Sequence, residues 1–201
     1  MKTSHHRPVA SHALLATALV AACVALPLTA ADPAVAQTAT SKAMAPKNVS
    51  SKDKNFIEEA AAGGMLEVQG SQLALQRATD PEVKQFAEQM VKDHEKVNKQ
   101  LMTLVSPKGV QPPAELPMMM RTKLNSLSKE QGAKFDEEYM DKIGVDAHKD
   151  TVKLFEKAAK DLNDPELKKF AADTLPSLKE HLSMAQQLDA KIEKKMKANK
   201  K

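Results

Sequence analysis

The chain of 201 residues contains one eight-residue pattern twice, and each copy has the composition of a helix start. Residues 80–87 read Asp-Pro-Glu-Val-Lys-Gln-Phe-Ala, and residues 164–171 read Asp-Pro-Glu-Leu-Lys-Lys-Phe-Ala. A capping aspartate accepts hydrogen bonds from free backbone N–H groups, proline fits the first helical position, and glutamate is favoured at the positive end of the helix dipole. Because a long helical pattern precedes each copy, the repeat predicts two pairs of helices.

Apolar residues recur at helical spacing on both sides of each copy, and no alternating strand pattern competes with them. We predict helices over residues 54–78, 81–105, 133–162 and 165–196, with Pro176 kinking the last of them. Prolines and a glycine interrupt residues 107–117, so we expect a loop there, followed by a short helix over 117–128. The fold class that follows is all-α, an up-down-up-down four-helix bundle over residues 55–195.

The first 36 residues have the three-part pattern of a secretory signal. Lys2 and Arg7 are basic, an apolar run covers residues 13–28, and small residues then lead to Ala36, after which we expect cleavage. The segment that ends at Cys23 also resembles a bacterial lipobox, so lipidation of Cys23 is the alternative. Neither interpretation leaves a pair of cysteines for an intrachain disulfide. The sequence thus predicts an exported protein of the periplasm or outer membrane, with a lipoprotein as the alternative.

Composition limits the class of partner. The 30 basic and 26 acidic residues fall to 28 and 25 without residues 1–36, and this balance argues against nucleic-acid binding. With no Trp, one Tyr and five Phe, stacking platforms for bases or sugars are not expected. We expect residues 37–54 to form a flexible leader and residues 196–201 a basic tail, and either segment could associate with the envelope or an anionic membrane surface.

Four ionisable residues occupy positions where the helical stripes would ordinarily carry apolar side chains. His94, His148 and His181 each fall on the stripe of a different predicted helix, and Glu67 falls on the stripe of a fourth. The remaining histidines, at positions 5, 6 and 12, lie in the predicted signal segment. Because a buried ionisable group is costly unless it is paired, hydrogen-bonded or bound to metal, something must hold these four side chains.

Counting along the chain predicts that the four residues meet. Glu67 lies 13 residues before Asp80 and His94 lies 14 after it, while His148 lies 16 residues before Asp164 and His181 lies 17 after it. In an up-down-up-down bundle both Asp-Pro turns lie at the same end. The two pairs would then differ in height by about 4.5 Å, at 1.5 Å per helical residue.

Three imidazoles and a carboxylate form a suitable ligand set for one zinc, iron or copper ion. The alternative is a buried cluster without metal, in which Glu67 accepts hydrogen bonds from the imidazoles. Composition and spacing leave both interpretations open.

Methionines offer softer ligands near two of the histidines. Met90 lies one turn before His94, and Met184 lies nearly one turn after His181, so accessory thioethers would favour copper. The run of three methionines at residues 118–120 lies beside the proline-rich loop, and we interpret it as packing.

Several short motifs follow one another in a fixed order along residues 55–190. They are Ala61-Ala62-Gly63-Gly64 with Glu67, Val83-Lys84 with Phe86-Ala87, Met90-Val91 with Asp93-His94, Phe135-Asp136 with Tyr139, His148 with Leu154-Phe155-Glu156, and Leu175-Pro176 with Leu178 and His181-Leu182. In these motifs and their spacing the chain resembles a family of exported bacterial proteins, the domain of unknown function 4142, which is related to the ferritin-like bundles and often labelled outer-membrane. The resemblance implies a helical bundle and export, and it implies no established activity.

The histidines depart from the pattern of ferritin-like di-iron centres, which use Glu-x-x-His motifs. Val91, Val145 and Leu178 stand three residues before the three histidines, so none of these positions carries a carboxylate. A single ion therefore fits this chain better than a di-iron centre.

We expect an exported bundle protein that binds one metal ion through Glu67, His94, His148 and His181, and that serves envelope stress or metal homeostasis rather than catalysis. One alternative is a mononuclear metalloenzyme, because three histidines leave a coordination position open. A second alternative is a metal-free structural or interaction module whose core histidines respond to pH.

Overall fold

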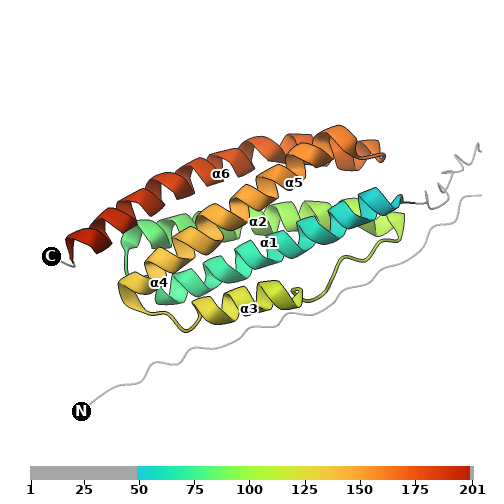
Figure 1. Ribbon diagram of the computed structural model, residues 1–201. Helices are drawn as coiled ribbons and strands as arrows, with labels where there is room; N and C mark the ends of the chain where they lie inside the picture. The colour runs from blue at the N-terminus through green and yellow to red at the C-terminus, as the bar shows by residue number, and fades with distance from the viewer. Residues whose placement is uncertain (1–48, 200–201) are drawn as a thin grey trace, which may run out of the picture. The chain divides into compact units, whose positions relative to one another are not determined.

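The computed structural model describes residues 49–199, and every regular element in this range is a helix (Figure 1). The elements are α1 (Ser51–Arg77), α2 (Pro81–Val105), the 3-10 turn η1 (Ser106–Lys108), α3 (Met118–Leu127), α4 (Gly132–Tyr139), the π-helical η2 (Met140–Ala147), α5 (His148–Asp161) and α6 (Pro165–Ala198). Because α4, η2 and α5 are continuous, they form one rod, and the bundle has five helical rods. The expected signal segment, Cys23 and the leader up to residue 48 lie outside the described residues.

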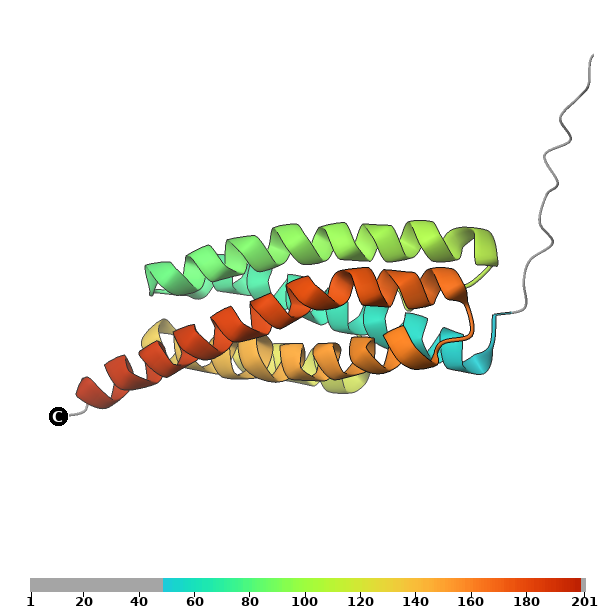
Figure 2. The same cartoon turned by 90° about the horizontal axis from the view of Figure 1, so that it is seen from above.

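The predicted helices are confirmed to within three residues at each end. Both Asp-Pro copies cap helices as expected: Asp80 accepts a hydrogen bond from the N–H of Glu82, and Asp164 accepts from the N–H groups of residues 166 and 167. α1 begins three residues earlier than expected because the Ser50 hydroxyl caps it. α6 contains Pro176 and changes direction along its length, as Figure 2 shows.

The path of the chain differs from the expected up-down-up-down order, which is wrong. α1 and α6 run in one direction, whereas α2 and the α4–α5 rod run in the other (Figures 1 and 2). At the start of α1, Asp53 accepts hydrogen bonds from the N–H groups of residues 163 and 164. At the other end, Asp136 of α4 accepts from the N–H groups of residues 79 and 80. The two Asp-Pro turns thus lie at opposite ends, and the order is up-down-down-up.

The long connection between α2 and α4 explains this order. Residues 109–117 can span about 30 Å and the ten residues of α3 about 15 Å, which together exceed the roughly 38 Å length of α2. The segment and α3 run back along α1, so the next rod starts from the end at which α2 started (Figure 1). The connection is thus one long crossover between two rods that run in the same direction.

The core consists of two apolar clusters separated by a layer of buried polar residues. One cluster, which includes Phe86, Tyr139 and Ile143, lies toward the end that holds the first Asp-Pro turn. The other, which includes Phe56 and Phe155, lies toward the opposite end. Between the two apolar clusters lie six buried polar residues, Glu67, Ser71, His94, His148, Thr151 and His181. The middle of the bundle is therefore where polar chemistry is concentrated.

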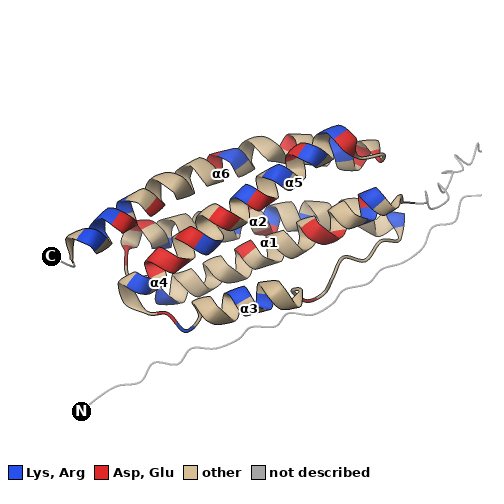
Figure 3. Ribbon diagram, viewed as in Figure 1, with Lys and Arg blue, Asp and Glu red and all other residues tan. Residues whose placement is uncertain are grey.

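The outer surface carries both signs of charge. Basic and acidic residues alternate along α5 and α6 in Figure 3. Near the C-terminal end of α6, Lys191 pairs with Glu82 of α2, and Lys195 pairs with Asp80, the residue that caps α2. None of the helices between residues 49 and 199 is long and apolar enough to cross a membrane.

Small residues on α1 allow its neighbours to approach closely. A Cβ added at Gly70 would lie 3.0–3.3 Å from three atoms of the buried Ile143 side chain. A Cβ added at Gly63 would meet only the Thr151 hydroxyl at 3.5 Å, an ordinary contact. The two glycines therefore form a matched pair for a test of packing.

We predict that Gly70→Ala lowers the free energy of unfolding by about 1–2 kcal/mol, because overpacking against Ile143 outweighs the better helix propensity of alanine. Gly63→Ala is the control and should leave the stability unchanged or raise it by up to about 1 kcal/mol. Urea denaturation followed by far-UV circular dichroism measures both. Equal effects of the two substitutions would contradict the packing described above.

Candidate metal centre

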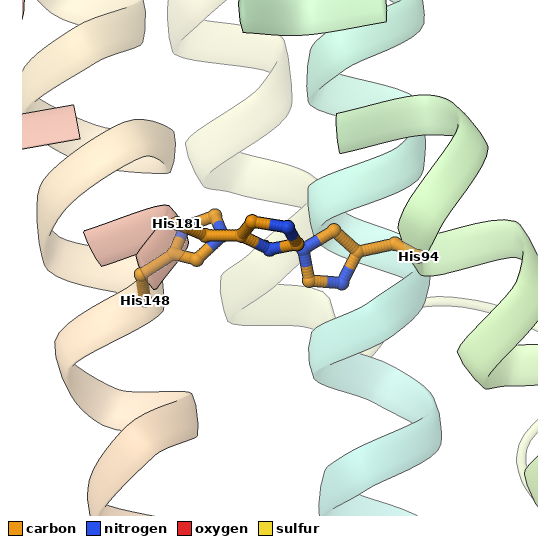
Figure 4. A group of neighbouring side chains, drawn as sticks. All are labelled: His94, His148 and His181. Carbon is orange, nitrogen blue, oxygen red and sulfur yellow. The ribbon is translucent and has the colours of Figure 1, made fainter. Parts of the chain in front are cut away.

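Three histidines from three helices point toward one another in the middle of the bundle (Figure 4). His94 comes from α2, His148 begins α5, and His181 comes from α6; their exposed fractions are 2%, 0% and 4%. One ring nitrogen of each lies within 4.8 Å of the others, and the ring centroids are 5.1–5.7 Å apart. With Glu67 in contact with two of the rings, the predicted convergence of all four residues is confirmed.

The reason for the convergence is not the one that counting gave. The Asp-Pro turns lie at opposite ends of the bundle. The positions of Glu67 and His94 are therefore counted from one end, and those of His148 and His181 from the other. They meet because each residue lies 13–17 residues from its turn, which is close to the middle of rods 25–34 residues long.

One nitrogen of each imidazole, here called the outer nitrogen, lies beside an oxygen atom. For His94 this is Nδ1, which lies 3.0 Å from Oε2 of Glu67. For His148 it is Nδ1, which lies 3.0 Å from the backbone oxygen of Ile143. For His181 it is Nε2, which lies 3.1 Å from Oδ2 of Asp93. A carbonyl or carboxylate oxygen can only accept, so a hydrogen on the neighbouring ring nitrogen makes each of the three contacts favourable.

The second nitrogen of each ring is left as a lone-pair acceptor when the ring is neutral. Nε2 of His94 and Nε2 of His148 lie 3.2 Å apart, so two such lone pairs would face each other. Nδ1 of His181 is buried and has no hydrogen-bond partner among the described residues. Unpaired buried acceptors are costly, so the arrangement favours a proton or a metal cation between the rings.

Glu67 is the buried carboxylate of the polar layer. The Thr151 hydroxyl donates to its Oε1 at 2.9 Å, and the same oxygen lies 3.8 Å from Nδ1 of His148. Its other oxygen contacts His94 without forming a well-aligned hydrogen bond. The carboxylate therefore lies beside Nδ1 of His94 and Nδ1 of His148, whereas the Nε2 atoms of these two rings face each other.

The charges of these groups are coupled. Burial raises the pKa of Glu67, but the imidazoles of His94 and His148 outweigh burial and lower it to about 2. Burial lowers the pKa of His94, but Glu67 outweighs burial and raises it. Burial lowers the pKa of His148, and burial together with the neighbouring imidazoles lowers that of His181 to about 4. Glu67 is thus ionised, and His148 and His181 are neutral near pH 7.

The π-helical segment positions His148. The sequence predicted an ordinary helix across this region, whereas Met140–Ala147 is wound more loosely. The carbonyl of Ile143, five residues before His148, lies in this segment and accepts from the His148 ring. Insertions of this type occur frequently at functional sites.

The methionines occupy different environments. Met90 and Met184 pack within the apolar cluster that contains Phe86, and their role as accessory ligands stays a prediction. In the run at 118–120, only Met120 packs against the core, while Met118 and Met119 are 74% and 85% exposed. The interpretation of the whole run as packing is therefore wrong for these two, which lie on the outer face of α3.

Sequence reasoning missed three partners of the cluster. Asp93 precedes His94 directly, and Thr151 follows His148 by three residues, so position next to a histidine or on its helical face was an available signal. No sequence signal pointed to the Ile143 carbonyl, because a backbone group is present in every residue whatever its type.

We predict that the metal-free protein loses stability as the pH falls from 6.5 toward 4.5. The folded-state pKa of His181 is about 4, below its ordinary value of 6.5, so the unfolded chain binds more protons in this window. His148 acts in the same direction, while the raised pKa of His94 acts in the opposite one. Urea midpoints across the window measure the slope, and His181→Leu should flatten it. An equally steep slope in that variant would contradict the assignment.

Comparison with solved structures shows which proteins share this fold. A DUF305 fragment from Deinococcus radiodurans matches with a TM-score of 0.63 and 12% identity, covering 71% of this chain and 98% of the other. A DUF305 protein from Streptomyces coelicolor, described as a candidate secreted protein, matches with a TM-score of 0.60 and 13% identity, covering 70% and 91%.

A third similar structure is that of CopM in a Cu(II)-bound form, with a TM-score of 0.58 and 23% identity, covering 69% of this chain and 96% of CopM. CopM is also known in a Cu(I)-bound form, which matches with a TM-score of 0.55. At these identities the likeness shows a shared fold. No curated protein matches the chain. The model of the domain of unknown function DUF4142 matches residues 37–188, and the chain therefore belongs to the DUF4142 family.

Proposed function

We propose that this protein binds one transition-metal ion through Nε2 of His94, Nε2 of His148 and Nδ1 of His181. The observation that carries the proposal is that one nitrogen of each ring lies 3.0–3.1 Å from an oxygen acceptor, so that the lone pair of a neutral ring falls on its other nitrogen. Metal-bound histidines in proteins almost always donate the other ring N–H to a carboxylate, a carbonyl or water. The three rings therefore resemble a ligand set already fixed in the correct tautomers.

The spacing of the nitrogens suits a single ion. Two nitrogens that bind one ion at about 2.0–2.1 Å in tetrahedral geometry are about 3.3–3.4 Å apart. Nε2 of His94 and Nε2 of His148 are 3.2 Å apart. One ring nitrogen of each of the three histidines lies within 4.8 Å of the others. A small rotation of the His181 ring completes a three-nitrogen site.

Glu67 then serves as the charged partner of the site, not as a ligand. Its Oε2 contacts the outer nitrogen of His94, and Thr151 orients the carboxylate. A negative charge at this position makes the imidazole a stronger donor and offsets part of the charge of the bound cation. The sequence predicted four metal ligands, and the proposal keeps the three histidines and assigns Glu67 a supporting role.

Copper is the ion that we propose. Imidazole suits copper, zinc and iron, and copper stands highest in the general affinity order of divalent ions. The structural neighbour CopM is known in Cu(II)- and Cu(I)-bound forms, which supports the choice. Zinc and iron are the other outcomes that the binding experiment can give.

Handling or storage of the ion fits the site better than catalysis. Each of the three histidines is less than 5% exposed, so a substrate could not reach the ion without movement of the helices. The predicted signal segment and the secreted structural neighbour support export. We therefore propose metal homeostasis in the cell envelope, on a scaffold whose single crossover supports the ferritin-like kinship.

The alternative function is a metal-free module held by a buried proton. The distance of 3.2 Å between the two Nε2 atoms also suits a hydrogen bond from a protonated His94 to His148, with Glu67 balancing the charge. The binding experiment below distinguishes the two.

We predict that the mature protein, purified without a histidine tag, binds one Cu(I) or Cu(II) ion per chain. Alanine at His94, His148 or His181 should abolish stoichiometric binding, because each supplies one of three ligands. Glu67→Gln should weaken affinity by about 10–100-fold while one ion still binds, as for other partners of metal ligands. Competition with a chromogenic chelator measures the affinities, and a rise in melting temperature gives a second readout.

Met90→Leu and Met184→Leu are the controls. Unchanged affinity in both would support a site made of nitrogen ligands, and a loss comparable to the histidine variants would overturn the proposed ligand set. Absence of binding and of any thermal shift with copper, zinc and iron would leave the proton-held cluster as the function of these residues.

A further inference from the structure

We infer that the ion reaches and leaves the cluster through the groove between α2 and α6, with Asp93 as its first contact and His181 as the ligand that moves. The inference rests on the proposed function, because it concerns the path to the same three nitrogens. It gives Asp93 a role in the rate of uptake in addition to its contact with His181.

The cluster approaches the surface at the His181–Asp93 pair. The carboxylate of Glu67 and the ring of His148 are 1% and 0% exposed, and Ile143 is buried as well. The Asp93 side chain, in contrast, is 36% exposed while its Oδ2 contacts Nε2 of His181. Among the described residues, His181 is the basic group that lies within ion-pair distance of Asp93. The Asp93 carboxylate is therefore a solvent-exposed oxygen donor in direct contact with the cluster.

Asp93 of this pair lines a groove of about 1000 Å³ between α2 and α6. Asp93 and Val97 line it from α2, and Thr174 and Ser177 line it from α6. Asp93 and Val97 flank His94 in the sequence, and Ser177 lies one turn before His181. The groove is therefore lined by sequence neighbours of two of the three ligands.

The wall of the groove on α6 is a weak point in the helix. Pro176 has no N–H group, so one hydrogen bond of the helix is lost within the turn that precedes His181. In the same turn, the hydroxyls of Thr174 and Ser177 bond to backbone carbonyls of their own helix. Because Pro176 removes one helical hydrogen bond, fewer bonds oppose a movement of this turn than in an unbroken helix. Such movement would turn His181 toward Asp93 and the groove.

The hollow on the other side of the bundle is a poorer route. It is lined by Gly63, Thr151 and Leu154, among others, and has a volume of about 560 Å³. The Thr151 hydroxyl at its inner wall donates to Glu67, so an ion from this side would have to displace a buried carboxylate before it met a histidine. This hollow supplies the matched control.

The test compares two double variants in full-length mature protein. Val97→Phe with Ser177→Phe fills the α2–α6 groove, and Leu154→Phe with Met120→Phe fills the opposite hollow. Uptake of Cu(II) is followed in a stopped-flow instrument by quenching of Tyr139, the only tyrosine of a chain without tryptophan. Tyr139 packs on Phe86, which in turn lies 6.4 Å from the His148 ring. Release is followed as transfer to excess chelator.

We predict that the groove variant slows both uptake and release by at least about tenfold while its dissociation constant changes little, because a blocked path raises the barrier in both directions. The control variant should keep wild-type rates. Equal rates in wild type and groove variant, or slowing only in the control variant, would overturn the inference while leaving the metal site intact. A wild-type protein that binds no metal would instead overturn the proposed function itself.

Asp93→Asn separates the two roles of this residue without adding bulk. The asparagine oxygen can still accept from Nε2 of His181, so the tautomer is kept while the charge at the mouth of the path is removed. Slower uptake is expected for a first contact. An unchanged uptake rate with faster release alone would show that Asp93 only positions His181.

Discussion

The contact between the Glu67 carboxylate and the His94 ring is the interaction on which the middle of this bundle depends. A buried carboxylate is tolerated only where positive or hydrogen-bonding groups compensate it, and here His94 and Thr151 do so. The polar layer that results divides the core into two apolar clusters, which pack the rods above and below it. The geometry of the three histidines is therefore a consequence of how the core is built.

The two ends of the bundle keep this middle layer in register. Asp53 caps the turn that precedes α6, and Asp136 caps the turn that precedes α2, each across more than fifty residues of sequence. Both aspartates are buried, Asp53 in the first turn of α1 and Asp136 within α4, one at each end of the bundle. Because the rods are fixed at both ends, residues near their midpoints meet at one height. The cluster thus depends on contacts far from it.

Sequence patterns predicted the helices, their caps and the members of the cluster, because each depends on residue type at local spacing. The chain order was wrong because a proline-rich connection with its own helix can either turn back or cross the bundle, and its length alone did not decide. The meeting of the three histidines with Glu67 was nevertheless predicted. All four residues lie near the middle of their helical rods, and the middle is the same from whichever end it is counted. The π-helical carbonyl of Ile143 could not be predicted, because it is a backbone acceptor created by a local change of winding.

The measurement that tests the central claim most directly is nitrogen NMR of the three imidazoles, in ¹⁵N-histidine-labelled mature protein in mildly alkaline buffer. The claim requires the hydrogen on Nδ1 of His94 and His148 and on Nε2 of His181 in the metal-free state. One equivalent of diamagnetic Cu(I) should then shift the other nitrogen of each ring and leave the protonated ones in place. The opposite tautomers, or spectra that do not change with the ion, would contradict it.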